Sequence, residues 1–142
     1  MMKFFFATLL AISSVYGADG PSAAGTWKLN VAKSYFSNSP SGGPREATLT
    51  ITDNGWTYTA TDGSGKKSDF SNKGDDTVTV KDEPTGNPYL HDTRFVAKES
   101  GKEIQRTVGA LLPDGKTLVT YSSGIAPDGK AWSDVSYWEK VP

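Results

Sequence analysis

The chain has 142 residues, with 15 Lys and Arg against 16 Asp and Glu, one His and no Cys. This length suits a single domain, and the lack of Cys excludes disulfides and cysteine-ligated metal centres. Without a basic block, neither nucleic acid nor an anionic membrane is an expected partner. Plentiful Thr, Ser, Gly and aromatic residues, without long helix-forming runs, predict an all-β protein.

The first residues have the pattern of a secretion signal. Lys3 supplies a positive start, residues 4–15 form an apolar run of 12, and small residues precede Ala18. We expect cleavage after Gly17, so that 1–17 is a signal peptide, 18–24 a flexible lead-in and 25–142 the folded domain. An apolar run of 12 is too short to cross a membrane, and no later stretch is longer. The pattern predicts a soluble bacterial protein exported to the periplasm or beyond the cell.

The first residues of the mature domain have the pattern of a β-strand. In the stretch 25–30, Trp27 and Leu29 alternate with polar residues, which is typical of a half-buried strand. Asn30 can cap a helix, and Tyr35 follows at helical spacing, so we expect one short helical turn after the first strand. The segment 37–44 is rich in Ser, Gly and Pro and predicts a surface loop.

Short alternating strands and tight turns follow to the end of the chain. Asp53-Asn54-Gly55 is a strong hairpin signal, and the sequence Pro-Asp-Gly-Lys occurs twice, at 113–116 and 127–130. The expected strands are 46–52, 56–61, 66–70, 77–81, 92–98, 103–108, 117–124 and 131–140. Together with the first, these predict an up-and-down antiparallel β-barrel of about 8–10 strands, because closure removes exposed edges. A barrel of this size is filled by side chains or holds one small ligand.

Several segments resemble a group of small exported bacterial proteins of uncharacterised function that are described as lipocalin-like. The segments are Gly25-Thr26-Trp27-Lys28-Leu29-Asn30, Thr85-Gly86-Asn87-Pro88, Pro113-Asp114-Gly115-Lys116-Thr117-Leu118 and Asp134-Val135-Ser136-Tyr137-Trp138-Glu139-Lys140. The resemblance implies a barrel and export, but no particular activity. It also implies that Trp27 closes one end of the barrel beneath a basic residue of the last strand, for which Lys140 has the right position.

Candidate ligand-binding residues come from strand parity. Trp56, Tyr58 and Tyr121 are candidate walls of a cavity, and Arg94 or Arg106 is the candidate polar anchor, because a guanidinium binds carboxylate or phosphate through two hydrogen bonds. The alternative for both arginines is an outward position, paired with Asp or Glu, because an uncompensated buried charge is costly.

The favoured function is binding of a small apolar or amphipathic ligand in or at the mouth of the barrel, by a monomer. The alternative is a structural or interaction protein of the bacterial envelope with a filled barrel. We expect no catalytic residue, metal or cofactor. His91 is the single histidine and has no partner identifiable in the sequence, and the acidic pairs at 75–76 and 82–83 lack the spacing of a calcium loop.

Overall fold

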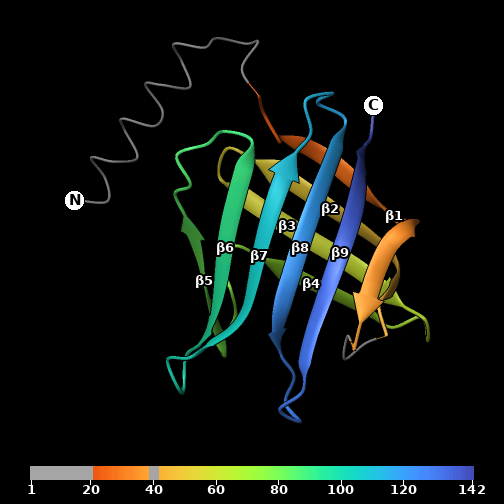
Figure 1. The fold of residues 1–142 in the computed structure, drawn as a ribbon. Coiled ribbons are helices and arrows are strands. Elements are labelled where there is room, and N and C mark those ends of the chain that lie inside the picture. The colour runs from red at the N-terminus through yellow and green to blue at the C-terminus, as the bar shows by residue number, and fades with distance from the viewer. Residues whose placement is uncertain (1–20, 39–41) are drawn as a thin grey trace.

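The structure is a computed structural model that describes residues 21–38 and 42–142. The expected signal peptide 1–17 lies outside the described residues, as does the beginning of the lead-in. Nine strands make up the fold (Figure 1): β1 (Gly25–Ser37), β2 (Pro44–Thr52), β3 (Gly55–Asp62), β4 (Lys67–Ser71), β5 (Val78–Glu83), β6 (Leu90–Ala97), β7 (Glu103–Leu111), β8 (Thr117–Ile125) and β9 (Ala131–Lys140).

All nine strands belong to one antiparallel sheet in the order β4-β3-β2-β1-β9-β8-β7-β6-β5. With one exception, neighbours in the chain are neighbours in the sheet, and the first strand also pairs with the last. The sheet curls so that β2, β3 and β4 cross behind β6 to β9 (Figure 1). The predicted all-β, up-and-down barrel is therefore confirmed.

The exception is the step from β4 to β5. Among the described residues, no backbone ladder joins these two strands, so the wall of the barrel is open there. The pairing of β1 with β9 joins the first and last strands into the same sheet. In this pairing Leu29 lies opposite Trp138 and Trp27 lies opposite Lys140. The two unpaired edges thus fall in the middle of the chain rather than at its ends.

The expected helical turn after the first strand is wrong, because β1 continues to Ser37. Its pairing with β9 shifts between Asn30 and Tyr35, where extra residues leave the ladder as a bulge. The bulge is held locally: the Ser34 hydroxyl donates to the Asn30 carbonyl oxygen (2.7 Å) and accepts a hydrogen bond from the Tyr137 N–H (3.0 Å). The helix-like spacing of this segment therefore reflects a bulge in a strand that tertiary pairing keeps extended.

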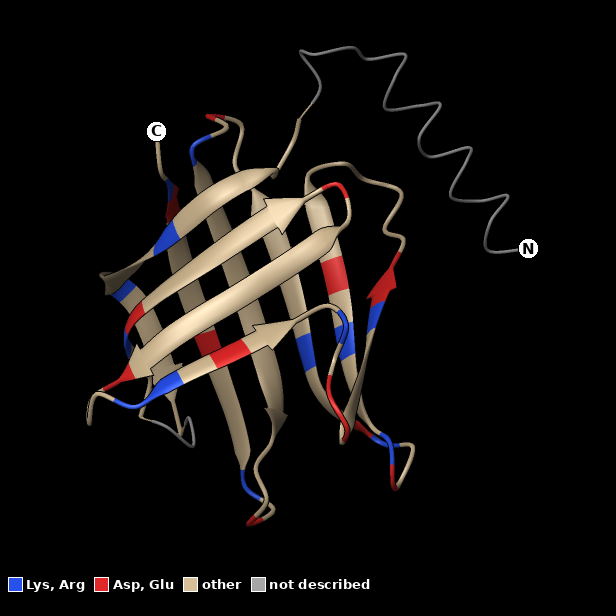
Figure 2. Ribbon diagram, turned by 180° about the vertical axis from the view of Figure 1, so that it is seen from behind, with Lys and Arg blue, Asp and Glu red and all other residues tan. Residues whose placement is uncertain are grey.

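The core is concentrated at one end of the barrel. Trp27 and Leu118 are fully buried, and Trp138, Ala47 and Leu111 complete the buried cluster. Charged residues lie mostly at hairpins and strand ends, leaving the bodies of the strands largely uncharged (Figure 2). In the part of the chain that the structure describes, no helix is long and apolar enough to cross a membrane.

Candidate functional site

One end of the barrel is closed by an indole, and we call it the closed end. Trp27 has no exposed surface, and its ring N–H donates to the Ala23 carbonyl oxygen at 2.8 Å. The Lys140 ammonium nitrogen lies 5.8 Å from the centre of the Trp27 ring, within the range of a cation–π contact. The lysine chain crosses over Gly25, where a Cβ would lie 2.9 Å from Lys140 Cε. This end is therefore packed, and a ligand must enter elsewhere.

The strands β6 to β9 turn four successive rows of side chains toward the interior, each row perpendicular to the strands. Cross-strand pairing gives these rows, from the closed end to the opposite, open end: Leu111, Leu118 and Trp138; then His91, Gly109, Thr120 and Ser136; then Thr93, Thr107, Ser122 and Asp134; then Phe95, Gln105, Gly124 and Trp132. The inner face is thus apolar at the closed end, polar in the two middle rows and mainly aromatic or small in the row nearest the open end.

The third of these rows, extended onto β5 by Asp82, carries an oxygen atom on every side chain, and we call it the polar row. Most of these oxygens are paired within the row. The Thr93 hydroxyl donates to Asp82 at 2.7 Å, and the hydroxyls of Thr107 and Ser122 lie 2.8 Å apart. The side-chain amide of Gln105, in the next row toward the open end, donates to the Thr107 hydroxyl at 3.3 Å.

Asp134 is the exception in the polar row. Its Oδ1 atom is buried and has no hydrogen-bond partner among the described residues. Burial raises the pKa of this carboxyl to about 6, although the backbone N–H of Ser37 favours the charged form. The pKa of Tyr58 is also raised, chiefly by burial and then by the charge of Asp134. The charge of Asp134 on β9 therefore acts on the phenol of Tyr58 on β3.

Aromatic rings line the wall opposite the polar row. The ring centres of Trp56, Phe70 and Phe95 lie 5.9–6.3 Å apart, in tilted contacts that reach from β3 and β4 to β6. Tyr58 meets Trp138 edge-on at 6.1 Å. The aromatic contacts bridge the interior beside the open edges of β4 and β5, where hydrogen bonds do not join the wall. The interior therefore has an aromatic wall on β3 and β4, which faces a wall on β6 to β9 that carries the polar row between aromatic residues.

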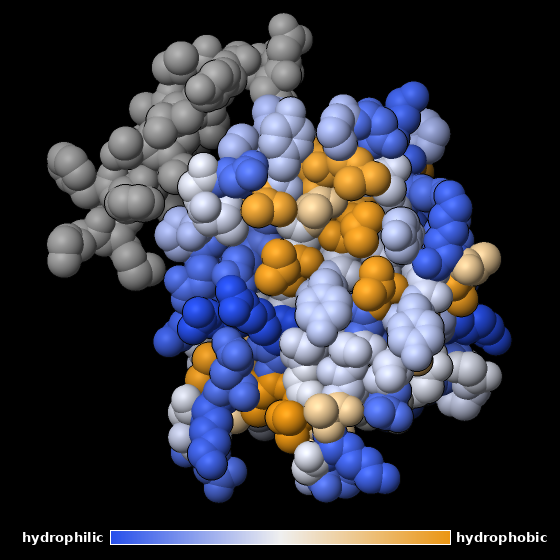
Figure 3. Space-filling view, in the orientation of Figure 1, coloured by the Kyte–Doolittle hydropathy of each residue, from blue (hydrophilic) through white to orange (hydrophobic). Residues whose placement is uncertain are grey.

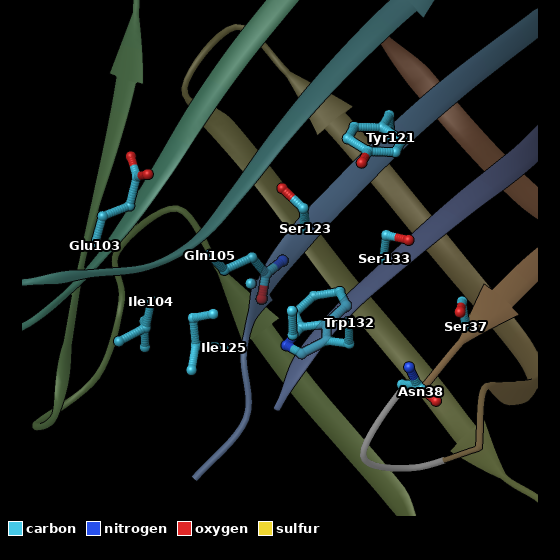
Figure 4. A pocket seen from close by; sticks show the side chains of 12 residues that line it. Ser37, Asn38, Glu103, Ile104, Gln105, Tyr121, Ser123, Ile125, Trp132 and Ser133 are labelled. Atoms are coloured by element: carbon cyan, nitrogen blue, oxygen red, sulfur yellow. The ribbon is translucent and has the colours of Figure 1, made fainter. Parts of the chain in front are cut away.

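The open end carries a hollow of about 530 Å³. Figure 4 shows Tyr121, Ser123 and Ser133 on β8 and β9, with Ser37 and Asn38 at the end of β1. Gln105, Gly124 and Trp132, from the inner row nearest the open end, line the same hollow. A Cβ at Gly124 would lie 2.9 Å from the Trp132 ring, so a glycine there leaves room for the indole. The hollow thus combines outward-facing side chains with the open end of the inner rows.

Three of the sequence-predicted ligand-binding residues lie on the outer face, and their expected place inside the barrel is corrected. Arg106 forms two hydrogen bonds with Asp92 (2.7 and 3.0 Å), and Arg94 lies 3.6 Å from Glu103. Both guanidiniums are about half exposed, which agrees with the alternative considered from the sequence. Water and the carboxylates of Asp92 and Glu103 stabilise their charge there, so neither guanidinium is buried without compensation.

Tyr121 is 50% exposed on the same outer face, in line with Val108 and Val135 of the neighbouring strands. Figure 3 shows that the centre of this face has side chains of intermediate hydropathy, with apolar side chains scattered among them. Tyr121 therefore lines the outer hollow but not the interior. Trp56 and Tyr58, the other two predicted wall residues, belong to the inner aromatic wall.

No protein-family model matches this chain, and no curated protein sequence matches it. Among solved structures, the chain is similar to the siderocalin Ex-FABP, which is described as functioning through dual ligand specificities. The two chains are 12% identical, the TM-score is 0.48, and the match covers 83% of this chain and 73% of Ex-FABP. We take no functional property from this likeness.

Sequence reasoning missed Asp134, although its signal was present. Trp132, Asp134, Ser136 and Trp138 share one parity along the last predicted strand, so an inward Trp138 places the carboxyl inward too. In the described residues, no group of three or more acidic or histidine side chains is arranged to hold a metal ion. The chemistry available in the interior is therefore hydrogen bonding and charge pairing by oxygen atoms, beside an aromatic wall.

Proposed function

We propose that this chain is an exported, lipocalin-like protein that binds a small, partly apolar ligand inside the open half of its barrel. One observation carries the proposal: part of the polar row keeps accessible surface. Leu118 and Trp138 are buried at the closed end and Thr93 and Phe95 are buried on β6, whereas Thr107, Ser122 and Asp134 on β7, β8 and β9 are only partly buried. Inward side chains that keep accessible surface leave space on the inner face for another molecule.

The two walls of this space define the kind of ligand. Trp56, Tyr58 and Phe70 offer flat apolar surface, and the polar row offers hydroxyl and carboxyl oxygens on the other side. A ligand with one apolar face or chain and a small polar group satisfies both walls at once. A wholly apolar ligand would leave the carboxyl group of Asp134 without water or a new partner.

Matched substitutions at neighbouring positions test where the ligand binds. Ser122 faces inward in the polar row, and Ser123, the next residue, faces outward and lines the hollow. The wild type is first screened by thermal shift and tryptophan fluorescence against apolar acids, alcohols and amines. For any compound that binds, Ser122→Phe fills the interior and is expected to weaken binding at least tenfold, whereas Ser123→Phe leaves it unchanged.

Circular dichroism of both variants establishes that they remain folded. The proposal fails if no class of compound binds and native mass spectrometry of protein from its own host shows no retained ligand. It also fails if only Ser123→Phe weakens binding, because the ligand then occupies the outer hollow.

A second candidate function, an interaction protein of the envelope, is favoured by the outer face. Tyr35 is 66% exposed and Tyr121 50% exposed, and both belong to one cross-strand row that Val135 joins. Exposed aromatic side chains in a row are typical of a protein-binding surface. This function predicts a partner that crosslinks to the wild type in cells and is lost when both tyrosines are changed to Ser, with ligand binding intact.

A further inference from the structure

The inner rows of β6 to β9 carry negatively charged side chains and no positively charged side chain to balance them. The polar row contains the carboxyl groups of Asp82 and Asp134, and none of the four rows contains Lys or Arg. Lys140 lies at the closed end, over Trp27, and the guanidiniums of Arg94 and Arg106 are outside. An acidic ligand would therefore meet like charge in the interior and no basic anchor.

From this arrangement we infer that the ligand carries a positively charged amine, which binds the partly buried carboxyl group of Asp134. The inference rests on the interior site proposed above and names the chemical class of its ligand. The paired oxygens of the polar row leave Asp134 as the acceptor that is free to receive a new donor. A buried carboxylate oxygen without a donor is costly, and an ammonium group supplies both a donor and a compensating charge.

Groups on every neighbouring element agree with an amine at this position. The phenol of Tyr58 on β3 is neutral at pH 7, and burial, followed by the charge of Asp134, raises its pKa further. The direct cross-strand neighbours of Asp134 are Ser122 on β8 and Phe36 on β1, which carry no charge. The aromatic rings nearby add an electron-rich surface that favours a cation over an anion.

Because the pKa of Asp134 is raised, binding of the amine should depend on pH. Because this pKa is about 6, the carboxyl is mostly charged at pH 7.5 and mostly protonated at pH 5. Partial burial lowers the pKa of His91, the other titratable side chain on the inner rows besides Asp82, so its ring is neutral at pH 7. An alkylamine stays protonated throughout this range. Binding of the amine should therefore weaken as the pH falls from 7.5 to 5.

A matched set of probes with one chain length tests the inference: decylamine, decanol and decanoate. Their affinities are measured by tryptophan fluorescence and calorimetry at pH 7.5 and pH 5. We expect decylamine to bind at least tenfold more tightly than decanol at pH 7.5, with decanoate weakest, as a charge-assisted hydrogen bond in a partly buried site requires. In Asp134→Asn the preference for decylamine over decanol should disappear, while decanol binds as before.

The control for net charge is Asp69→Asn, because Asp69 lies on the outer side of β4 and is exposed. This variant should keep the full preference for decylamine. Equal binding of decylamine and decanol by the wild type, or tighter binding of decanoate, overturns the amine inference and leaves the interior binding site standing. A preference that survives in Asp134→Asn, or is lost equally in Asp69→Asn, also overturns it. Failure of every probe and of the wider screen overturns the proposed function itself.

Discussion

At the position of Asp134, β9 places a carboxyl group inside the barrel, where its charge acts on the phenol of Tyr58. An acid in this position is held at a cost, because burial disfavours its charged form and Oδ1 has no donor among the described residues. Such a group is retained in a small protein without disulfides at the expense of stability.

The variant Asp134→Asn should be more stable than the wild type at neutral pH and equal to it in acid. Between pH 3.8 and about 6 the folded protein binds more protons at Asp134 than the unfolded chain, so this group lowers the free energy of unfolding as the pH rises through that window. Discounted for partial exposure, the gain on substitution should be about 1–2 kcal/mol at pH 7.5 and near zero at pH 3.5. Urea denaturation at a series of pH values measures it, and a difference that does not vary with pH would refute the assignment.

At the scale of the elements, the two Pro-Asp-Gly-Lys turns have the same sequence but form different numbers of hydrogen bonds. In the first, Asp114 accepts hydrogen bonds from the backbone N–H groups of Lys116 and Thr117 and from the Thr117 hydroxyl. In the second, Asp128 accepts one from the N–H of Lys130. The same hairpin type was predicted for both, and both hairpins form, connecting β7 to β8 and β8 to β9.

Replacing the first aspartate should therefore cost more than replacing the second. Asp114→Ala should lower the melting temperature by a few degrees more than Asp128→Ala, because three hydrogen bonds are lost instead of one. The difference should shrink in acid: the pKa of Asp114 is lowered by its hydrogen bonds, so its contribution is present above pH 3.8 and is lost as the pH falls through the lower, folded value. Calorimetry at pH 7 and pH 2.5 compares the pair, and equal effects at pH 7 would contradict the expectation.

At the scale of the whole molecule, the barrel is a single curled sheet whose two edges face the same gap. The edges belong to β4 and β5, and the aromatic contacts of Phe70 and Phe95 span the interior beside them. Strands at unpaired edges exchange their amide hydrogens and open more readily than central strands. At this gap, side-chain contacts and not backbone hydrogen bonds connect the two edges.

The variant Phe95→Ala should loosen this region before the rest. Phe95 is buried and contacts both Trp56 and Phe70, so truncation should cost about 3 kcal/mol. Hydrogen exchange followed by mass spectrometry should show faster exchange in β4 and β5, with β8 and β9 little changed. Val96→Ala, on the outer side of the same strand, is the control, and uniform acceleration in Phe95→Ala would mean that the contacts do not act locally.

Local patterning was enough to predict most of the fold. Alternation around Trp27 and Leu29, the Asn-Gly turn and the repeated Pro-Asp-Gly-Lys motif each act within a few residues, so they predicted strands and hairpins in their observed order. Tertiary structure decided what depends on partners distant in the chain. The bulge after Asn30 replaced a predicted helical turn because β9 pairs on both sides of it.

The candidate site, too, could be predicted from the sequence only in part. Strand parity placed Trp56 and Tyr58 among the possible interior residues, but it could not tell the inner from the outer face for a strand whose two faces are both partly apolar. Arg94 and Arg106 therefore remained ambiguous until the structure showed Glu103 and Asp92 beside them. The sequence by itself determined that short hairpins would build an all-β barrel. Only the tertiary structure decided which face turned inward, where the wall stayed open and that an acid, not an arginine, lies in the interior, because these depend on how distant strands pair and curl.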